Sequence, residues 1–413
     1  MFRYVTDLKA LAIDAESFPN IEISRWRALY NQFRCLFIIS NEDMRAKIRA
    51  VYPDCLTYLM EEYLRVFAPN RETHVSILDL LEVEATEMAY LSGDIDFLGN
   101  ALNFLGGTIW VTDSVRYTDA RIAPDLICHD LTTAENRLIG NMTGFLGERT
   151  LYPGSDRGGV VIPVRFAASN RIIYVYTLGR YFGYSHYMSQ LHPYSAAILL
   201  NKRPDKSYTG KFNDIFADLY IRVIKHIQSL RHVDSIVSVP FKPGAGDRFQ
   251  PIRNRISQEC SLEDLSEHFI CVKNYPSQKS RSSSTIRQAN IQGAFEYDGD
   301  LIGRNIVLID DVATTGSTLG ECVDVLDTHG ADDIFVVVLA INQMKGIYWS
   351  ANSAQVSCPK CGAQMQLMVN GQTGQFFYSC FSNQSRIGCG KSTMNFKDGV
   401  NKLIDWANSE FKT

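Results

Sequence analysis

The sequence predicts an α/β protein built on a parallel sheet, because one stretch of the chain has the pattern of a strand, a helix and a second strand. Residues 305–309 and residues 334–341 are apolar and rich in β-branched side chains, as expected for strands buried on both faces. A helical pattern runs between them from Leu319 to about His329, and Gly330 is a suitable helix stop. Two strands joined in this way form a βαβ unit, in which both strands are parallel.

Two acids and a hydroxyl-rich loop separate the first strand from the helix. Asp310 and Asp311 directly follow the apolar run. The loop residues are Ala313, Thr314, Thr315, Gly316, Ser317 and Thr318. Backbone N–H groups at the start of a helix suit a dianionic phosphate, and a glycine allows its close approach. Because neighbouring carboxylates instead suit vicinal sugar hydroxyls and Mg²⁺, the pattern predicts a site for a phosphorylated sugar at the carboxyl ends of the strands.

This combination of apolar residues, two acids and a Thr/Gly-rich loop resembles the signature of the type I phosphoribosyltransferases. The resemblance implies a Rossmann-like core that binds phosphoribosyl pyrophosphate (PRPP) with Mg²⁺, transfers the phosphoribosyl group to an acceptor and releases pyrophosphate. The loop lacks the Gly-Lys-Ser/Thr ending of a Walker A sequence, which argues against an ATPase of that kind. A Rossmann-like domain with an incidental acidic turn is the alternative.

Segments upstream of the acids narrow the resemblance. Residues 235–240 predict a strand that leads into a loop at 241–246, of the kind that handles pyrophosphate in type I enzymes. A Ser-rich stretch at 277–285 then precedes an Arg-x-x-Asn-x-x-Gly-Ala-Phe segment at 287–295. This order resembles the ComF family of competence-associated phosphoribosyltransferases over about residues 190–342.

Two further segments bear on the ComF resemblance. Residues 198–202 stand where that family has a Leu-Lys element, and we expect a strand there that ends at Lys202. The chain departs from the family at residues 247–249, Asp-Arg-Phe, where a more basic Arg-Gly-Phe-Asn segment is usual. Pyrophosphate contacts are therefore less well defined at this point, and Arg248 is a candidate for one of them.

The resemblance implies a role for each polar group. The two acids bind the ribose hydroxyls and Mg²⁺, the hydroxyl-rich loop binds the 5′-phosphate, and basic side chains bind pyrophosphate. The expected catalytic residues are Asp310, Asp311, Lys279 and Arg281. The other expected pyrophosphate ligands are Lys242 and Arg248. For Lys279 and Arg281 the alternative is a solvated charged loop. Purine salvage enzymes of the 6-oxopurine type have an acid in place of Thr314, which argues against hypoxanthine or guanine as the acceptor.

Four cysteines near the C-terminus predict a metal site. They are Cys358, Cys361, Cys380 and Cys389, four thiols within 32 residues. Tetrahedral Zn²⁺ takes four such ligands, and Gly362 after the first pair favours a turn in which backbone N–H groups face the sulfurs. The arrangement resembles the C-terminal zinc ribbons of type IA topoisomerases, with a Phe-Tyr-rich strand at residues 375–379 before the third cysteine.

Such ribbons often contact single-stranded DNA by base stacking, and the resemblance makes Phe377 and Phe381 candidate platforms. A structural cap without a nucleic-acid role is the alternative, because the segment is only mildly basic. A formal charge of −4 and a pI near 6.1 argue against broad, non-specific nucleic-acid binding by the whole chain.

Residues 1–150 predict a second α/β domain. Helical patterns cover residues 23–33 and 41–67, with a strand at 35–40 between them, and two strand-then-loop patterns follow at 89–96 and 106–112. Part of this stretch resembles the later motifs of haloacid-dehalogenase-like (HAD-like) phosphatases. The residues concerned are Ser40, the Gly-Asp-x-Asp segment at 93–96 and the strand pattern at 106–112.

That resemblance implies a phosphate contact for Ser40 and a Mg²⁺ contact for Asp94 or Asp96. The family's Asp-x-Asp-x-Thr nucleophile does not occur before Cys35, where only Asp7 and Asp14 are available. Without an aspartyl nucleophile the reaction has no covalent route, so we expect a degenerate domain used for binding or assembly. An unrelated α/β domain is the alternative.

The length of 413 residues predicts two or three domains. A Gly-, Pro- and Arg-rich stretch at 141–171 predicts a boundary, which gives domains at 1–150, 151–345 and 346–413. The longest apolar run is too short to span a bilayer, and without a signal peptide we expect a cytoplasmic protein with no membrane partner. The sequence is compatible with a homo-oligomer.

Two functions fit the sequence. The first is an active PRPP-dependent transferase with an unidentified acceptor and Zn²⁺ in a structural role. The second is a catalytically silent PRPP sensor, coupled through the zinc ribbon to DNA or a protein partner in DNA uptake, repair or phage defence. The intact pair of acids favours the transferase, whereas the departure at residues 247–249 favours the sensor.

Overall fold

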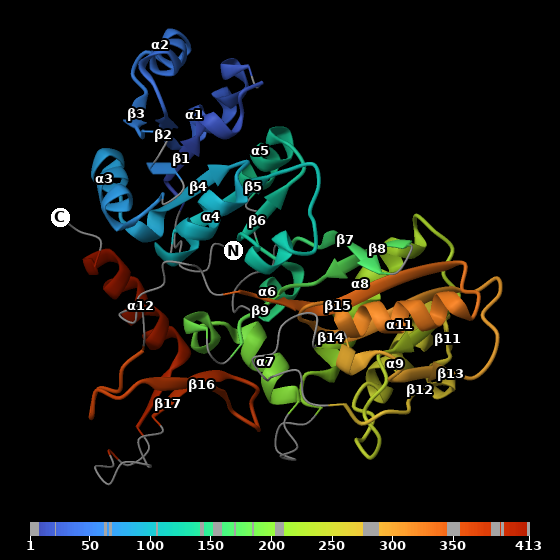
Figure 1. The fold of residues 1–413 in the computed structure, drawn as a ribbon. Helices are drawn as coiled ribbons and strands as arrows, with labels where there is room; N and C mark the ends of the chain where they lie inside the picture. Colours follow the sequence, from blue (N-terminus) through green and yellow to red (C-terminus); the bar gives the residue numbers. More distant parts are fainter. Residues whose placement is uncertain are drawn as a thin grey trace.

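The computed structural model describes residues 8–20, 22–61, 64–65, 68–104, 106–140, 144–151, 159–168, 171–183, 186–202, 210–275, 289–344, 356–380, 389 and 392–410. These residues form four sheets, two large and two small, with helices around the two large ones (Figure 1). The predicted α/β class with parallel sheets is confirmed, and a small antiparallel sheet follows near the C-terminus.

The first 140 residues form a six-stranded parallel sheet, which we call the N-terminal unit together with its helices. The strand order is β3-β2-β1-β4-β5-β6, so the direction of winding reverses between β1 and β4. Its strands are β1 (Ala10–Asp14), β2 (Arg34–Ile39), β3 (Leu56–Leu59), β4 (Met88–Ser92), β5 (Gly107–Val111) and β6 (Leu126–Cys128). Its helices are α1 (Arg27–Gln32), α2 (Glu42–Val51), α3 (Arg71–Leu81), α4 (Ile95–Ala101) and α5 (Leu131–Ile139).

One expectation for this unit was wrong, and one strand was not predicted. The helix predicted over 41–67 ends at Val51, because Tyr52 and Pro53 lead into a turn, and the short strand β3 follows. The strand β1 was not predicted, although every one of its residues is buried and it lies in the middle of the sheet. Its short run, Ala-Leu-Ala-Ile-Asp, carries too few β-branched side chains to stand out as a strand.

A second sheet of seven strands follows the order β11-β10-β14-β15-β8-β7, with β9 paired to β15, and we call this part the central unit. Its strands are parallel except β7, which pairs antiparallel with β8. They are β7 (Ile162–Ala168), β8 (Arg171–Thr177), β9 (Arg180–Tyr181), β10 (Ser235–Ser238), β11 (Glu263–Asp264), β14 (Asn305–Ala313) and β15 (Asp333–Asn342). The helices around this sheet are α6 (Leu146–Leu151), α7 (Pro193–Asn201), α8 (Asn213–Gln228), α9 (Gln250–Cys260) and α11 (Ser317–Thr328).

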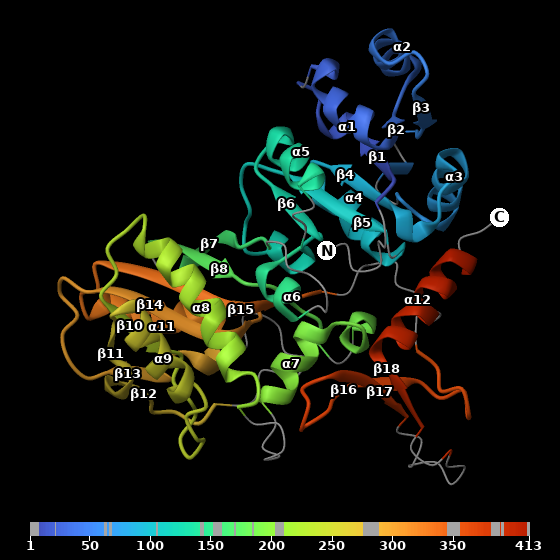
Figure 2. The same cartoon turned by 180° about the vertical axis from the view of Figure 1, so that it is seen from behind.

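The alternation of side chains along β14 explains how this sheet is covered on both faces. Ile306 and Leu308 belong to one core cluster together with α11, whereas Val307 and Ile309 belong to another together with α8 and α9. Figure 2 shows α8 and α9 from behind. A separate hairpin of β12 (Phe269–Cys271) and β13 (Phe295–Tyr297) flanks the sheet.

Two expectations for the central unit were wrong. Residues 193–201 form the helix α7 rather than a strand, because Pro193 at its first turn and the cap at His192 start a helix that is buried on nearly all sides. The strand β14 continues past Asp310 and Asp311 to Ala313, since β15 pairs with it that far. The stretch at 141–171, where we expect a domain boundary, contains α6 and the strand β7, and the boundary stays a prediction.

The remaining part, residues 356–410, forms the C-terminal module. Its strands are β16 (Met365–Val369), β17 (Phe376–Cys380) and β18 (Thr393–Asn395), which make an antiparallel sheet. The helix α12 (Phe396–Glu410) then returns to the N-terminal unit, where Thr86 Oγ1 donates a hydrogen bond to Asn408 Oδ1 at 3.2 Å and Arg71 donates to the Glu410 carbonyl at 2.7 Å. Both views show α12 beside α3 (Figures 1 and 2). None of the helices in the described ranges is long and apolar enough to cross a bilayer.

Candidate functional site

The two acids of β14 lie side by side but differ in their surroundings. Asp311 is buried, and its carboxylate contacts Lys202 Nζ at 2.7 Å and the guanidinium of Arg248. Burial alone would raise the pKa of Asp311, but these two cations outweigh it and lower the pKa. The pKa of Asp310 is raised to about 7, first by burial and then by the negative charge of Asp311. The pair therefore carries one firmly ionised carboxylate and one that titrates near neutral pH.

The hydroxyl-rich loop lies between the end of β14 and the first turn of α11. Gly316 has a positive φ of 84°, and a β-carbon there would lie 2.2 Å from the ring of Phe166, so this position accepts only glycine. Thr315 Oγ1 and Ser317 Oγ are 3.0 Å apart, and the Gly320 N–H donates to the Gly316 carbonyl at 2.8 Å. The loop thus leads into a helix N-terminus, where unpaired N–H groups and the helix dipole favour an anion.

The basic side chains of the site come from separate segments. Lys202 lies at the C-terminal end of α7, and Lys242 and Arg248 lie in the loop between β10 and α9. Lys242 Nζ donates a hydrogen bond to the backbone carbonyl of Tyr275 and lies 4.2 Å from the centre of the Tyr275 ring. Of the predicted site residues, the structure brings together the two acids, Arg248 and the loop. Lys279 and Arg281 lie outside the described residues.

The departure at residues 247–249 has a local structural cause. Asp247 accepts hydrogen bonds from the N–H groups of Phe249 and Gln250 at the start of α9, at 2.9 and 3.1 Å. The same carboxylate pairs with the buried Arg253 at 2.7 Å, which lowers the pKa of Asp247 against the effect of burial. Asp247 therefore stabilises the start of α9. The guanidinium of the next residue, Arg248, contacts the carboxylate of Asp311.

Sequence reasoning missed several residues of the site. Lys202 was expected on a strand, and its ion pair with Asp311 was not foreseen. Tyr220, on α8, donates to the Asp310 carbonyl at 2.6 Å, and Tyr117, from the N-terminal unit, donates to the Thr314 carbonyl at 3.1 Å. These partners are between 90 and 197 residues away in the chain, and no local pattern connects them.

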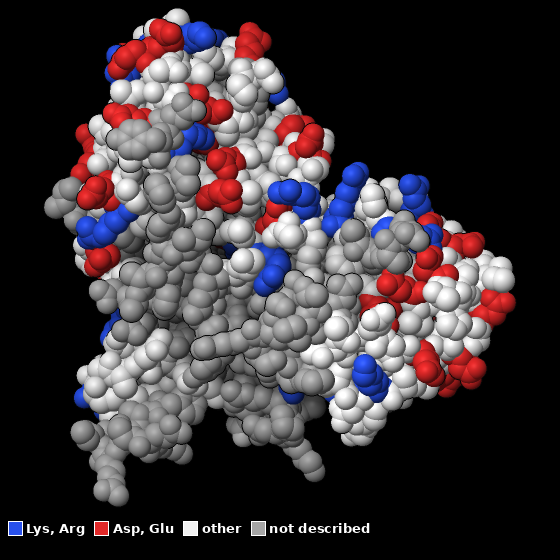
Figure 3. All heavy atoms as spheres, in the orientation of Figure 1, with Lys and Arg blue, Asp and Glu red and all other residues white. Residues whose placement is uncertain are grey.

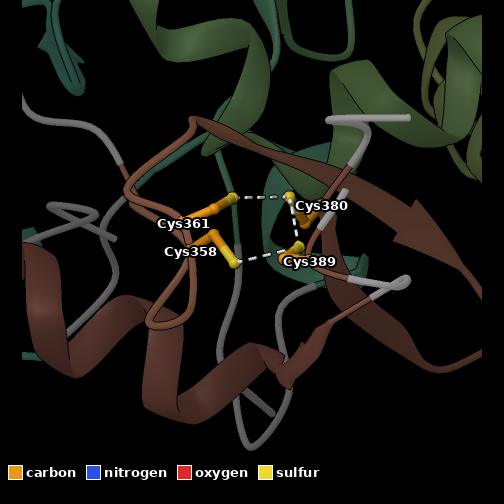
Figure 4. Close-up of side chains that lie close together, drawn as sticks. All are labelled: Cys358, Cys361, Cys380 and Cys389. Carbon is orange, nitrogen blue, oxygen red and sulfur yellow. Dashed lines mark hydrogen bonds between the residues drawn. The ribbon is translucent and has the colours of Figure 1, made fainter. Parts of the chain in front are cut away.

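The four cysteines of the C-terminal module form one cluster, and they are the group that could hold a metal ion among the described residues (Figure 4). Three Sγ–Sγ separations are 3.7 Å for Cys358 and Cys389, 3.6 Å for Cys361 and Cys380, and 3.4 Å for Cys380 and Cys389. These are too long for disulfides, in which the sulfurs are about 2.05 Å apart. Burial opposes ionisation of Cys358, but the backbone N–H groups of Lys360 and Cys361 outweigh it and lower the pKa of this thiol.

The C-terminal module packs against the central unit through aromatic side chains. The rings of Phe212 and Phe376 are stacked with their centres 6.4 Å apart. Phe377, one of the two predicted stacking platforms, is partly exposed on β17, and Phe381 lies outside the described residues. On the face seen in Figure 3, acidic and basic side chains are interspersed over the N-terminal unit.

The carboxyl end of the N-terminal sheet also gathers polar side chains. Ser40 donates to Glu16 from its N–H and its hydroxyl, at 2.7 and 2.8 Å, and Asp94 caps α4. Asp14 ends the central strand β1, is fully buried and accepts two hydrogen bonds from Arg65 at 2.7 and 2.6 Å. Asp14, one of the two acids available before Cys35, thus stands at the end of the first strand, although the Asp-x-Asp-x-Thr motif is missing there. The HAD-like interpretation stays a prediction.

Comparisons with known proteins agree with the position of the candidate site. The family model described as "Phosphoribosyl transferase domain" matches residues 255–366, which include both acids and the loop. The DNA utilization protein YhgH of Shigella flexneri is 39% identical over 54 residues, which are 13% of this chain and 24% of that protein. The YhgH protein of Escherichia coli K12 is 41% identical over 49 residues, which are 12% of this chain and 22% of that protein.

The chain thus spans about a quarter of the length of the curated relatives it matches. Among solved structures, the purine phosphoribosyltransferase from Pyrococcus horikoshii Ot3 is 20% identical with a TM-score of 0.21, over 33% of this chain and 76% of that one. Residues 255–366, the part of the chain that holds the paired acids and the hydroxyl-rich loop, are thus similar to the phosphoribosyl transferase domain.

Proposed function

We propose that this protein is a Mg²⁺-dependent phosphoribosyltransferase that transfers the phosphoribosyl group of PRPP to an acceptor and releases pyrophosphate. The observation that carries the proposal is the junction of β14 and α11, where two carboxylates and a glycine-containing loop meet the N-terminus of a 12-residue helix. The match of residues 255–366 to the phosphoribosyl transferase domain supports it.

Each part of the junction suits one part of PRPP. We assign the ribose hydroxyls to Asp310 and Asp311, and the 5′-phosphate to the loop at 313–318, because the start of α11 favours a dianion. The carboxylate oxygens also fit Mg²⁺, which takes oxygen ligands and would offset the charge of pyrophosphate. When the bond from C1′ to pyrophosphate breaks, positive charge develops on the ribose beside the two carboxylates, which stabilises that state.

The leaving pyrophosphate needs cations. Before a ligand binds, Lys202 and Arg248 both pair with Asp311. PRPP is strongly anionic, so we expect it to compete with that carboxylate and to draw both cations toward pyrophosphate. There they would stabilise the negative charge of the leaving group. We assign the same role to Lys242, Lys279 and Arg281.

A second candidate function is a PRPP sensor without turnover. The structural use of Asp247 favours it, because that acid accepts hydrogen bonds from the first N–H groups of α9 and pairs with Arg253 where the ComF segment is more basic. A sensor would pass a ligand-driven change to the C-terminal module and from there to DNA or a protein partner. The name of the matched relatives, DNA utilization proteins, supports a context of DNA uptake, repair or phage defence.

We further propose that the four cysteines hold a structural Zn²⁺. Four sulfurs at about 2.3 Å from a tetrahedral zinc ion lie about 3.8 Å from one another. The separations of 3.4 to 3.7 Å between Sγ atoms support this assignment. The module then serves as a structural cap or contacts single-stranded DNA, for which Phe377 is a candidate platform.

We also propose three domains, at 1–150, 151–345 and 346–413, with the first used for binding or assembly. The six-stranded, seven-stranded and three-stranded sheets, each built from a different part of the chain, support this division. The strand order of the first sheet and the polar side chains at its carboxyl end support a relation to the HAD-like fold.

Calorimetric titration of Mg²⁺ and PRPP tests the main proposal. The wild type should bind PRPP, and the double variant Asp310→Asn/Asp311→Asn should lose binding. The matched control is Asp332→Asn/Asp333→Asn, because these two neighbouring acids are exposed and lie at the other end of the sheet, at the start of β15. It should bind as the wild type does.

Pyrophosphate release with a panel of nitrogenous acceptors then separates the two candidate functions. Release that depends on one acceptor supports the transferase. Binding without release for any acceptor supports the sensor. If the folded, zinc-loaded wild type does not bind PRPP, both proposals are wrong.

A further inference from the structure

A segment of the N-terminal unit lies directly on the central unit. Residues 115–117 follow β5 and pair with the edge strand β7 through backbone hydrogen bonds. The Tyr117 N–H donates to the Arg165 carbonyl at 3.2 Å, and the Arg165 N–H donates to the Val115 carbonyl at 3.3 Å. The chain of one unit is thereby fixed to the sheet of the other, next to the loop after β14.

Tyr117 extends from this segment to the hydroxyl-rich loop. Its side chain is buried, and its ring packs edge-on against Phe166 at a centre distance of 5.1 Å. Phe166 in turn lies against Gly316, where a β-carbon would be 2.2 Å away. The Tyr117 hydroxyl donates to the Thr314 carbonyl at 3.1 Å. One tyrosine of the N-terminal unit therefore contacts the loop by a hydrogen bond and, through Phe166, by packing.

The hydrogen bond to Thr314 has a consequence for the next residue. A trans peptide is planar, so the carbonyl of Thr314 and the N–H of Thr315 belong to one rigid unit and are directed oppositely. A donor that holds the Thr314 carbonyl toward the N-terminal unit therefore directs the Thr315 N–H to the opposite side of that peptide, away from Tyr117. A loop that binds an anion needs its N–H groups held in fixed directions.

Tyr117 remains a donor over the whole working pH range. Burial raises the pKa of Tyr117 far above its ordinary value, and the charge of Arg121 offsets this only in part. The phenol therefore stays protonated. A phenylalanine would keep the packing on Phe166 but could not hold the Thr314 carbonyl.

We propose that Tyr117 is a positioning residue for the 5′-phosphate. The N-terminal unit thereby supplies one residue to the site of the central unit. The inference rests on the proposed function, because it assigns the loop to the phosphate of PRPP. In this arrangement the transferase site consists of two parts of the chain. The conformation of the N-terminal unit then acts on phosphate binding through one hydrogen bond.

Three ligands test the inference in the full-length protein with Mg²⁺: PRPP, ribose 5-phosphate and pyrophosphate. Tyr117→Phe should lower the affinity for PRPP and the affinity for ribose 5-phosphate by about fivefold each, the size expected for one neutral hydrogen bond. Pyrophosphate lacks the 5′-phosphate, so its affinity should not change. The control Tyr174→Phe removes a hydroxyl from a half-exposed tyrosine of β8, and all three affinities should equal those of the wild type.

The selectivity between ligands distinguishes positioning from general damage. Equal weakening of all three ligands, or unchanged binding of ribose 5-phosphate, would overturn the inference while leaving the transferase proposal intact. If the wild type binds none of them, the proposed function fails and the inference fails with it. Thermal unfolding of each variant confirms that it is folded at the assay temperature. A second variant, Tyr117→Trp, keeps a ring and a donor of different reach. We expect the same selectivity between the three ligands from it.

Discussion

Lys202 Nζ lies 2.7 Å from Asp311 Oδ1, although the two residues are 109 positions apart in the chain. The lysine ends α7 and the acid lies near the end of β14, so the ion pair joins a helix to the carboxyl end of the sheet. Together with Arg248 it keeps Asp311 ionised beside a partner acid of raised pKa. Polar groups in the centre of the site are thus already paired before a ligand binds.

Lys202→Met should weaken Mg²⁺–PRPP binding by roughly 10- to 100-fold, the range for a lost hydrogen bond that involves a charge. The reason is that the variant removes a cation assigned to pyrophosphate. The control Lys225→Met deletes an exposed lysine of α8 and should bind as the wild type does. Titration calorimetry measures both. An affinity in Lys202→Met equal to that of the control would show that Lys202 serves Asp311 alone.

Asp310 should make stability depend on pH. Its pKa is about 7 in the folded protein and near 3.8 in the unfolded chain, so the folded state binds more protons between these values. The contribution of this carboxyl to stability is complete below about pH 4 and is lost as pH rises through about 7. Asp310→Asn should therefore increase the free energy of unfolding at pH 8, on the order of 2 kcal/mol because the carboxyl is partly exposed.

Urea denaturation at pH 5 and pH 8 checks this prediction. The difference between Asp310→Asn and the wild type should be larger at pH 8. The control Asp333→Asn changes an exposed acid at the amino end of β15 and should give the same small difference at both pH values. A difference for Asp310→Asn that does not depend on pH would contradict the raised pKa.

Removal of zinc should separate the C-terminal module from the rest of the fold. Cys361→Ser takes away one of the four thiols of the cluster, whereas the control Cys271→Ser changes a thiol on β12 outside it. The wild type and the control should contain about one zinc ion per chain by atomic absorption, and Cys361→Ser should contain much less. Because the module carries α12, limited proteolysis should release residues near 396–410 first from the variant. Equal metal content in all three proteins would exclude the four-cysteine site.

A buried ion network connects the N-terminal and central units. Arg180, on β9, is 2% exposed and lies 2.9 Å from Asp125 and 2.9 Å from Glu148. Arg180→Met should destabilise the protein by about 3–5 kcal/mol, because it removes the guanidinium that pairs with both buried carboxylates and leaves only His192, at 3.3 Å, beside Glu148. The control Arg34→Met breaks an exposed pair with Glu82 and should cost less than about 1 kcal/mol. Urea denaturation compares them, and equal costs would mean that solvent reaches the network.

The site illustrates what the sequence can and cannot predict. The order strand, acids, loop and helix around Gly316 was predicted because each element leaves a local pattern, and the cysteine cluster was predicted because ligand spacing is local as well. The helix α7 was mistaken for a strand because a fully buried helix has no polar face to show its period.

Contacts between distant segments left no such pattern. The hydrogen bond from Tyr117 to Thr314 joins residues 197 positions apart, and the Arg180 network joins three segments that have no shared motif. A single sequence reports the periodicity of an element but not the partner that it meets. The side chains that connect the units could therefore be found only in the structure.

The return of α12 to the N-terminal unit bears on how the protein is synthesised. Thr86 and Arg71 meet partners 322 and 339 positions further along the chain. A ribosome makes the surface around these residues early and the helix that covers it much later, so a nascent chain exposes this surface for most of its synthesis. Because contacts of such long range also form late in refolding, the docking of α12 should be among the final steps by which the chain becomes resistant to proteases.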